Sequence, residues 1–224
     1  MKTNRDVIPR LYFRYNKVMI KAIVFDVNGV LQRPSFRHFF PYVHLSPKEL
    51  YTFFRLSRSA SFKKANLGEY KTREELVDAL CHELPQYSEA IRRVYKKRWE
   101  YYFTEWNSSV KILRNLAKEY DIYLLSNQSA SEKEHILSYP FVKLVKGVFF
   151  SCDHHRMKPD PACFEAFLKE YDLKAKECLF IDDSAKNIAV AKQLGFIGLR
   201  KDLFFSDRIV RELLDKTREC NEMK

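Results

Sequence analysis

Five short apolar runs, each followed by a segment long enough for a helix, constrain the fold of this chain most strongly. Short runs rich in β-branched and aromatic residues, alternating with helical periodicity, indicate parallel strands that helices cover on both faces. We therefore predict an α/β fold in which a doubly wound, Rossmann-like parallel sheet forms the middle of three layers. The runs are Ala22–Phe25, Ile122–Leu125, Gly147–Phe150, Leu179–Ile181 and Phe196–Leu199.

The segments between the later runs have the 3.6-residue periodicity of amphipathic helices. Pro161 suits the first turn of one predicted helix, and Gly195 suits the end of another. The region from Phe205 to the end of the chain is predicted to contain a closing helix, with Val210 and Leu213 on its apolar side. The other predicted helices cover Val110–Tyr120, Ser131–Leu137, Pro161–Tyr171 and Ala185–Leu194.

A long gap separates the first apolar run from the second, and it contains no convincing strand. Its clearest amphipathic segments are Pro47–Arg58, Thr72–Cys81 and Ser88–Phe103. Thr72 followed by Glu75 has the spacing of a helix capping box. We predict a helical cap at residues 35–106, inserted into an α/β core formed by residues 19–34 and 107–224. Residues 1–18 are interpreted as an N-terminal extension.

The composition limits the function classes. A net charge of +11 and a pI near 9.3 attract phosphorylated small molecules or nucleic acid. No apolar stretch has the length of about 20 residues that a membrane span needs, so no membrane role is expected. The five cysteines show no zinc-binding spacing and the first residues show no signal-peptide pattern, which favours the cytoplasm. No pattern defines an oligomeric state.

Polar residues follow four of the predicted strands. The carboxyl ends of parallel strands meet at one edge of a sheet, where ligands bind in open α/β folds. Three of these residues are acids that repel one another, and a hard divalent cation with oxygen ligands would neutralise them. We therefore expect a Mg²⁺ site for a phosphorylated substrate at this edge. The residues are Asp26 and Asn28, Ser126 and Asn127, Lys158, and Asp182 and Asp183.

Four segments resemble the motifs of the haloacid dehalogenase-like (HAD) hydrolases, in the order and spacing of that family. The resemblance extends from about Met19 to Leu199, and the large insertion resembles the helical C1 cap of subfamily I. It implies a hydrolase, most often a phosphatase or phosphomutase of small phosphorylated metabolites. The segments are Ile23–Leu31, Leu124–Asn127, Lys158–Pro161 and Phe180–Asn187.

The resemblance also implies a role for each residue. Asp26 is the expected nucleophile, which forms an aspartyl-phosphate that water hydrolyses. Ser126 and Asn127 are expected to hold the oxygens of the transferred phosphoryl group. Lys158 is expected to neutralise Asp26 and the phosphate.

The resemblance places Mg²⁺ on the Asp26 carboxylate, the backbone carbonyl of Asn28, and one of the two acids after the fourth strand. We favour Asp183 as the direct ligand and Asp182 as its hydrogen-bonded neighbour. Asn187 is expected to brace that loop.

Asn28 departs from the family pattern. Phosphatases of the family carry Asp at this position, where it protonates the leaving oxygen and later deprotonates water. An amide cannot transfer a proton near neutral pH. Three consequences are open: slow turnover, a preference for good leaving groups such as acyl or aryl phosphates, or a proton supplied by a residue of the cap. The histidines that are candidates by type are His38, His44, His154 and His155, of which His155 lies three residues before Lys158.

Two alternative functions compete with a phosphatase. One is a catalytically impaired HAD-fold protein that binds phosphorylated ligands or nucleic acid through a basic and aromatic segment of the cap. The other is a 2-haloacid dehalogenase, which Asp182 and Asp183 disfavour because that reaction needs no metal. The basic and aromatic segment comprises Arg92, Arg93, Tyr95, Lys96, Lys97, Arg98, Trp99, Tyr101 and Tyr102.

Overall fold

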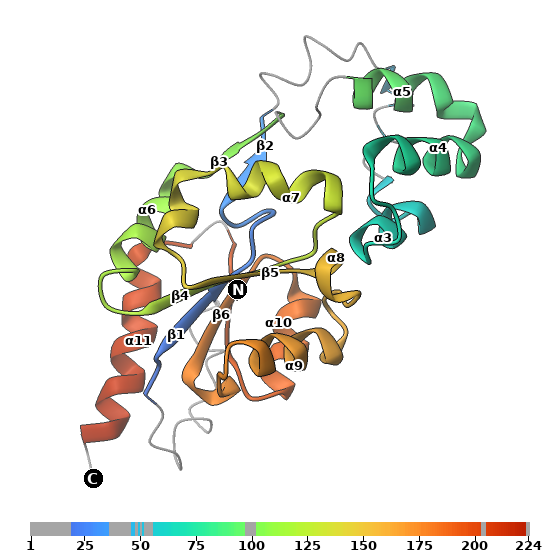
Figure 1. Cartoon of the computed structure of the whole chain (residues 1–224). Helices are drawn as coiled ribbons and strands as arrows, with labels where there is room; N and C mark the ends of the chain where they lie inside the picture. Colours follow the sequence, from blue (N-terminus) through green and yellow to red (C-terminus); the bar gives the residue numbers. More distant parts are fainter. Residues whose placement is uncertain are drawn as a thin grey trace, which may run out of the picture.

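Five parallel strands form the central sheet, in the order β5-β4-β1-β6-β7 (Figure 1). The computed structural model describes residues 19–35, 46, 47, 49, 51, 56–96, 102–202 and 205–222. All five predicted runs are strands in it, so the predicted fold class is confirmed. Their bounds are β1 Ala22–Phe25, β4 Asp121–Ser126, β5 Gly147–Phe150, β6 Cys178–Asp182 and β7 Ile197–Arg200.

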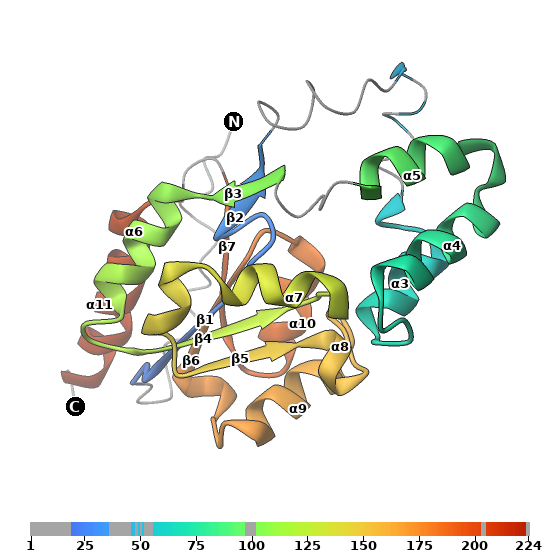
Figure 2. The ribbon, with the colours of Figure 1, turned by 45° about the horizontal axis from the view of Figure 1, so that its top comes forward.

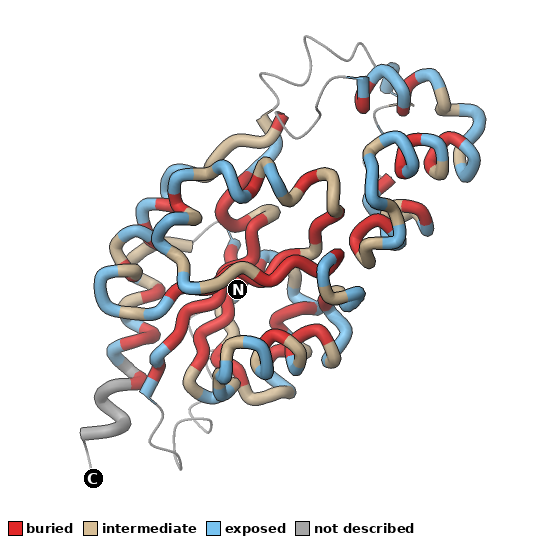
Figure 3. Tube along the Cα trace, in the orientation of Figure 1, coloured by how far each residue is buried: buried red, intermediate tan, exposed pale blue. Residues whose placement is uncertain are grey.

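Alternation along β1 divides the hydrophobic core between the two faces of the sheet. Ile23 and Phe25 belong to one buried cluster, whereas Ala22 and Val24 belong to the other. Side chains of successive strand residues point to opposite faces, and all four are 0–1% exposed. Both faces of the central strands are therefore covered, and Figure 3 shows these strands mostly in red.

Helices cover the two faces separately (Figure 2). Residues of α6, α7 and α11 contribute to the cluster that contains Phe25, and residues of α9 and α10 contribute to the cluster that contains Val24. Pro161 begins α9 as predicted, with Asp160 as its N-cap. The bounds are α6 Asn107–Leu116, α7 Ala130–Leu137, α9 Pro161–Glu170, α10 Ala185–Gln193 and α11 Asp207–Glu222, with 3₁₀ turns η4 Pro140–Leu144 and η5 Ala175–Glu177.

Three helices between β1 and β4 form a separate small core around Leu76, Leu80 and Val94. We call α3 Ala60–Asn66, α4 Arg73–Glu83 and α5 Ser88–Lys96 the inserted helices; 3₁₀ turn η2 Pro85–Tyr87 joins the last two. Thr72 and Glu75 form the predicted capping box at the start of α4. Only half of the predicted helix at Pro47–Arg58 lies in the described part. Helix α5 is described as far as Lys96; residues 97–101 lie outside the described residues, and Phe103, the predicted end of this helix, begins β3.

Two short strands connect the inserted helices to the sheet domain. β2 Gln32–Pro34 and β3 Phe103–Glu105 pair antiparallel. The expectation that the insertion contains no strand was therefore wrong, because β3 lies within it. Each strand has only three residues, and its extended form depends on a partner about 70 residues away in sequence. Such pairing leaves no periodic pattern that a sequence can show.

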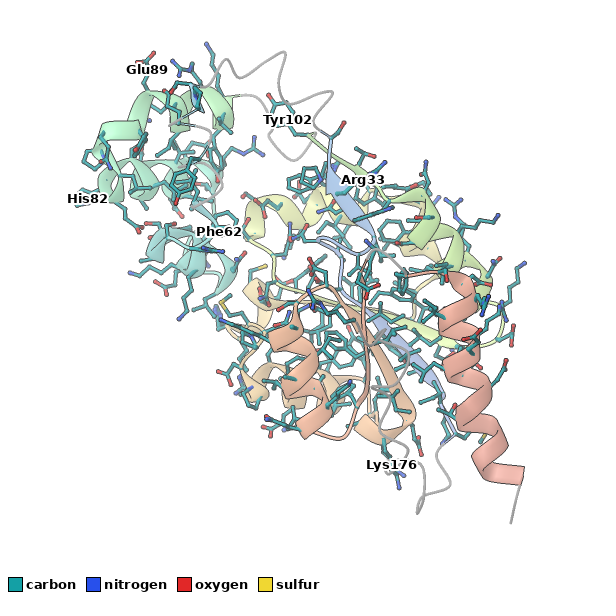
Figure 4. The ribbon with its side chains drawn as sticks, turned by 180° about the vertical axis from the view of Figure 1, so that it is seen from behind. Arg33, Phe62, His82, Glu89, Tyr102 and Lys176 are labelled. Carbon is teal, nitrogen blue, oxygen red and sulfur yellow. The ribbon has the colours of Figure 1, made fainter. Side chains whose placement is uncertain are left out.

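The inserted helices lie beyond the carboxyl ends of β4 and β5, next to α8 Ser151–His154 (Figure 1). In the reverse view, His82 and Glu89 lie at the far end of the inserted helices, while Lys176 lies at the opposite end of the molecule (Figure 4). Residues 1–18 lie outside the described part. No helix in the described part is both long and apolar enough to cross a membrane.

Candidate active site at the carboxyl edge of the sheet

Lys158 lies between two acids that come from different strands. Its Nζ is 2.9 Å from Oδ1 of Asp26, which follows β1, and 2.8 Å from Oδ2 of Asp182, which ends β6. Nζ also donates to the carbonyl of Leu125 in β4, at 2.7 Å. The Lys158 side chain is 1% exposed. The structure thus brings together three of the predicted site residues.

Burial and neighbouring charge shift the pKa values of this group. Burial raises the pKa of Asp26 to about 7; Lys158 opposes this rise, and Asp182 and Asp183 add to it. Burial alone lowers the pKa of Lys158, but the attraction of Asp26 and Asp182 outweighs burial and raises it. The pKa of Asp183 is raised by burial and by Asp182. The site therefore holds more negative charge than its lysine compensates.

Asp182 is saturated with protein hydrogen bonds. Asn187 donates from Nδ2 to both of its oxygens, at 3.0 and 2.9 Å, and the backbone N–H of Ser184 donates at 2.8 Å. With Lys158, four contacts surround a carboxylate that is 0% exposed. The fixed position of Asp182 orients Lys158 and the start of α10. Asn187 thus makes the bracing contact that the sequence predicted.

Asp26, Asp182 and Asp183 each offer a carboxylate oxygen, and these oxygens lie within 4.8 Å of one another. Asp183 lies above Gly29, where an added Cβ would be 2.8 Å from the Asp183 Cγ. Gly29 has a φ of 76°, a conformation that glycine adopts without strain. A glycine is therefore needed to bring the β1 loop against Asp183. The oxygen donors and the excess negative charge fit a hard divalent cation.

Ser126 and Asn127 at the end of β4 differ in what their side chains contact. The Ser126 Oγ is buried and has no hydrogen-bond partner among the described residues. Asn127 donates from Nδ2 to the Lys158 carbonyl and accepts the Lys158 N–H at Oδ1, both at 2.8 Å. A buried hydroxyl without a partner is costly unless a ligand satisfies it. Ser126 is thus available to a ligand, whereas the Asn127 side chain holds the lysine loop.

Asn28 is held at both ends of its side-chain amide. Nδ2 donates to Oε1 of Gln128 at 2.9 Å, and Oδ1 accepts from Nε2 of Gln32. Gln128 in turn donates from Nε2 to Glu132 at 2.9 Å, and Gln32 accepts from the Tyr139 hydroxyl at 3.0 Å. Sequence reasoning missed these partners, because isolated glutamines outside the motifs carry no recognisable pattern.

Lys201 is a further positive side chain at the edge of the site. Its Nζ donates to the carbonyl of Gly29 at 2.9 Å and lies over the ring of Trp106. Burial lowers its pKa to about 8, although Asp183 opposes this shift. Lys201 follows β7 and was also missed, since a lysine after a last strand has no distinctive sequence context.

The inserted helices touch the site domain at α8. Ser151 Oγ donates to the carbonyl of Asn66 at 2.6 Å and accepts the Gln128 N–H at 2.9 Å. The His155 Nδ1 lies 2.7 Å from the carbonyl of Leu67. His155 therefore contacts the inserted helices, and His154 stacks on Phe149. His38 and His44 lie outside the described residues.

Four described residues of the basic and aromatic segment make contacts within the insertion. Tyr95 and Tyr102 are buried, at 5% and 6% exposure, in the core of the inserted helices. Arg92 pairs with Asp78, and Arg93 pairs with Glu49 and Glu89. Lys97, Arg98, Trp99 and Tyr101 lie outside the described residues. The two described tyrosines are not exposed for stacking on bases.

Fold and site together define a class of protein: a doubly wound α/β protein with acids, a lysine and an unpartnered hydroxyl at the carboxyl edge of its sheet. A family model described as haloacid dehalogenase-like hydrolase matches residues 20–195. The chain belongs to the haloacid dehalogenase-like hydrolase family.

Comparisons with individual proteins agree with this assignment. The chain is 27% identical to a D-ribitol-5-phosphate phosphatase from Bacteroides thetaiotaomicron over 191 residues, which are 80% of this chain and 90% of that protein. A HAD family enzyme from the same bacterium, solved with magnesium and inorganic phosphate, has a TM-score of 0.65 at 21% identity, covering 84% of this chain and 96% of that one. An L-2-haloacid dehalogenase from Xanthobacter autotrophicus has a TM-score of 0.61 at 18% identity, covering 88% and 83%. The structural likenesses show the fold.

Proposed function

We propose that the protein is a Mg²⁺-dependent phosphatase of small phosphorylated metabolites, with Asp26 as its nucleophile. The observation that carries this proposal is the buried contact of Asp26 with Lys158, beside two further acids and the unpartnered Ser126 hydroxyl. These groups offer a nucleophile, a cation binder and a donor to a phosphoryl oxygen in one place. A relative that is a sugar-alcohol phosphate phosphatase supports the substrate class.

In the proposed reaction, a carboxylate oxygen of Asp26 attacks phosphorus and the leaving oxygen takes the bonding electrons. Lys158 remains protonated and neutralises charge on the nucleophile and on the phosphoryl oxygens. The Ser126 hydroxyl donates to one of those oxygens. A water oxygen then bonds to phosphorus as the Asp26 oxygen–phosphorus bond breaks, which releases inorganic phosphate and regenerates the Asp26 carboxylate. The proton that the water loses is taken up, through solvent, by the leaving oxygen of the first step.

Asp26, the backbone carbonyl of Asn28 and Asp183 are proposed to hold Mg²⁺. The cation supplies charge neutralisation that allows a phosphate dianion to approach a carboxylate. Asp182 is proposed as a supporting residue, because its oxygens already accept four protein contacts. Residues 35–106 are proposed as the cap that selects the substrate, residues 19–34 and 107–224 as the catalytic core, and residues 1–18 as an extension.

The proposal is tested by measuring phosphate release from a panel of sugar-alcohol and sugar phosphates, with Mg²⁺ and with EDTA. We expect release that needs Mg²⁺ and that Asp26→Asn abolishes. Asp202→Asn, which changes an acid outside the proposed site, is the matched control for the loss of one negative charge. Release that persists in EDTA, or in Asp26→Asn, would contradict the proposal.

A catalytically impaired phosphate-binding protein is the second candidate, and Asn28 is the observation that favours it. An amide at this position removes a proton-transfer group that contributes about 10²- to 10⁴-fold to a rate. Binding of inorganic phosphate in the presence of Mg²⁺, without release from any ester in the panel, would favour this candidate. A dehalogenase is disfavoured by Asp182 and Asp183, and halide release from 2-haloacids in EDTA would reverse that judgement.

A further inference from the structure

The two described side chains that hydrogen-bond to the side chain of Asn28 are amides. Gln128 accepts from Asn28 Nδ2, and Gln32 donates to Asn28 Oδ1. We call Gln32, Asn28 and Gln128 the amide collar. Gln32 is 2% exposed and Gln128 is 4% exposed, so the two glutamines are closed to water, whereas Asn28 between them is partly exposed. Its members can donate and accept hydrogen bonds but cannot exchange protons near neutral pH.

The titratable groups of this network lie one step behind the collar. Glu132 accepts from Gln128, and the Tyr139 hydroxyl donates to Gln32 while its oxygen lies 3.0 Å from the His135 Nε2. Burial raises the pKa of Tyr139 to about 12. An amide therefore stands between Asn28 and each of these groups, and none of them contacts the position from which the family's phosphatases transfer protons.

The other charged side chains of the site are already engaged in contacts. Lys158 is a buried cation held by two acids, and the oxygens of Asp182 accept four contacts. Asp183 is proposed to hold Mg²⁺, and Lys201 donates to the carbonyl of Gly29. None of the four is a free base that can take a proton from water. The described site thus provides a nucleophile and charge stabilisation, but no positioned general base.

From this we propose that the aspartyl-phosphate on Asp26 is long-lived, and that phosphate donors whose leaving groups need no proton load it. This inference rests on the proposed function of Asp26. The donor class is acyl and aryl phosphates, whose carboxylate or phenolate leaves as a stable anion. Donors with alkoxide leaving groups need a proton at the leaving oxygen and react slowly.

The two half-reactions differ in what they need from the protein. In the first, the Asp26 oxygen–phosphorus bond forms, the donor oxygen–phosphorus bond breaks, and the leaving anion keeps the electron pair. No proton moves. In the second, a water oxygen bonds to phosphorus, the Asp26 oxygen–phosphorus bond breaks, and the water loses a proton. Only the second half-reaction needs a base, so the collar slows it selectively and the phosphoenzyme accumulates.

The test is intact-protein mass spectrometry after acid quenching of the full-length protein mixed with acetyl phosphate and Mg²⁺. We expect the wild type to gain the mass of one phosphoryl group and Asp26→Asn to gain none. In Asn28→Asp the adduct should disappear about 10²- to 10⁴-fold faster once the donor is removed, because a general base contributes about that factor. The mass of the untreated wild type checks that the Asn28–Gly29 pair has not deamidated.

A second variant is needed because the carboxylate of Asn28→Asp would face the side-chain oxygen of Gln128, which repels it. Gln128 presents a carbonyl oxygen to position 28 because its amide nitrogen donates to Glu132. Glu132→Gln allows the Gln128 amide to turn and donate to a carboxylate at position 28. The double variant Asn28→Asp/Glu132→Gln should therefore lose the adduct at least as fast as Asn28→Asp. Thermal unfolding of each variant verifies that it is folded.

The outcomes separate this inference from the proposed function. A persistent wild-type adduct whose lifetime is shortened by Asn28→Asp, or by the double variant alone, supports the inference. Equal adduct lifetimes in the wild type and in both variants overturn the inference. Mg²⁺-dependent phosphate release by the wild type with no accumulated adduct also overturns the inference. Both results leave the proposed function standing. If no protein shows either an adduct or Mg²⁺-dependent phosphate release, the proposed function itself is overturned.

Discussion

At the scale of single residues, replacing Ser126 tests whether its side chain acts in phosphate binding rather than in stability. Its buried hydroxyl lacks a partner among the described residues, and a buried unsatisfied polar group costs about 1–3 kcal/mol. Ser126→Ala should therefore leave the free energy of unfolding unchanged or raise it, while inorganic phosphate binds more weakly in the presence of Mg²⁺. Calorimetric titration and thermal unfolding measure the two effects. Ser109→Ala is the matched control, since the Ser109 hydroxyl is also buried and unpartnered but lies in α6; weaker phosphate binding in both variants would contradict the assignment.

The raised pKa of Asp26 predicts how Mg²⁺ binding depends on pH. Burial moves this pKa from 3.8 to about 7, so the metal-free folded protein binds a proton that the unfolded chain has lost. The stabilisation from Asp26 is complete below about pH 4 and is lost as pH rises through about 7. Mg²⁺ needs the ionised carboxylate, and its affinity should fall about tenfold per unit as pH drops below 7. Calorimetric titration between about pH 5.5 and 7.5 measures this slope, which Asp26→Asn should flatten; an unchanged slope would remove Asp26 from the metal site.

The acids, the lysine and the serine could be predicted because motif order and strand ends identify them. Gln128 and Lys201 could not, since their contacts join segments 100 and 172 residues apart. Gln32 could not, since its side chain joins Asn28 to Tyr139, which lies 107 residues further along the chain. The hydroxyl of Ser126 and the amide of Asn127 were expected to act alike. The structure separates them, because the Asn127 amide matches the two backbone groups of Lys158 while the serine hydroxyl meets none.

At the scale of elements, the sequence predicted the five strands and the helices beside them from periodicity and capping residues. It missed β2, β3 and α8, which are three or four residues long, because segments this short contain fewer than two repeats of the strand or helix pattern and so show no periodicity. These short elements connect the inserted helices to the site. Their positions depend on tertiary contacts such as the hydrogen bond from Ser151 to Asn66.

Gly68 allows α3 to approach α8, and its replacement tests that junction. An added Cβ would collide with the carbonyl oxygen of Cys152, and φ is 75°. Gly68→Ala should lower the free energy of unfolding by more than the roughly 1–2 kcal/mol that a left-handed conformation costs alone. Gly195→Ala is the matched control, since φ is 96° there but the nearest atom is an Ala175 Cβ at 3.8 Å. We expect only Gly68→Ala to change KM, as measured by steady-state kinetics; equal effects of the two variants would show that backbone strain alone explains them.

At the scale of the whole molecule, a net charge of +11 will attract any polyanion, and the question is whether that attraction is specific. Specific binding of single strands combines backbone charge with bases stacked on exposed aromatic rings. Tyr95 and Tyr102 are buried, and Arg92 and Arg93 are paired with acids of the insertion. We therefore expect fluorescence anisotropy to detect oligonucleotide binding at about 50 mM salt and to lose it near roughly 150 mM, as screening weakens a contact of charge alone. The opposite result is oligonucleotide binding that persists at the higher salt concentration and is weakened by Arg92→Ala or Arg93→Ala. That result would indicate that the inserted helices bind nucleic acid rather than select a small phosphate. Loss of oligonucleotide binding at the higher salt concentration would indicate that the positive charge serves to attract small phosphorylated anions to the carboxyl edge of the sheet.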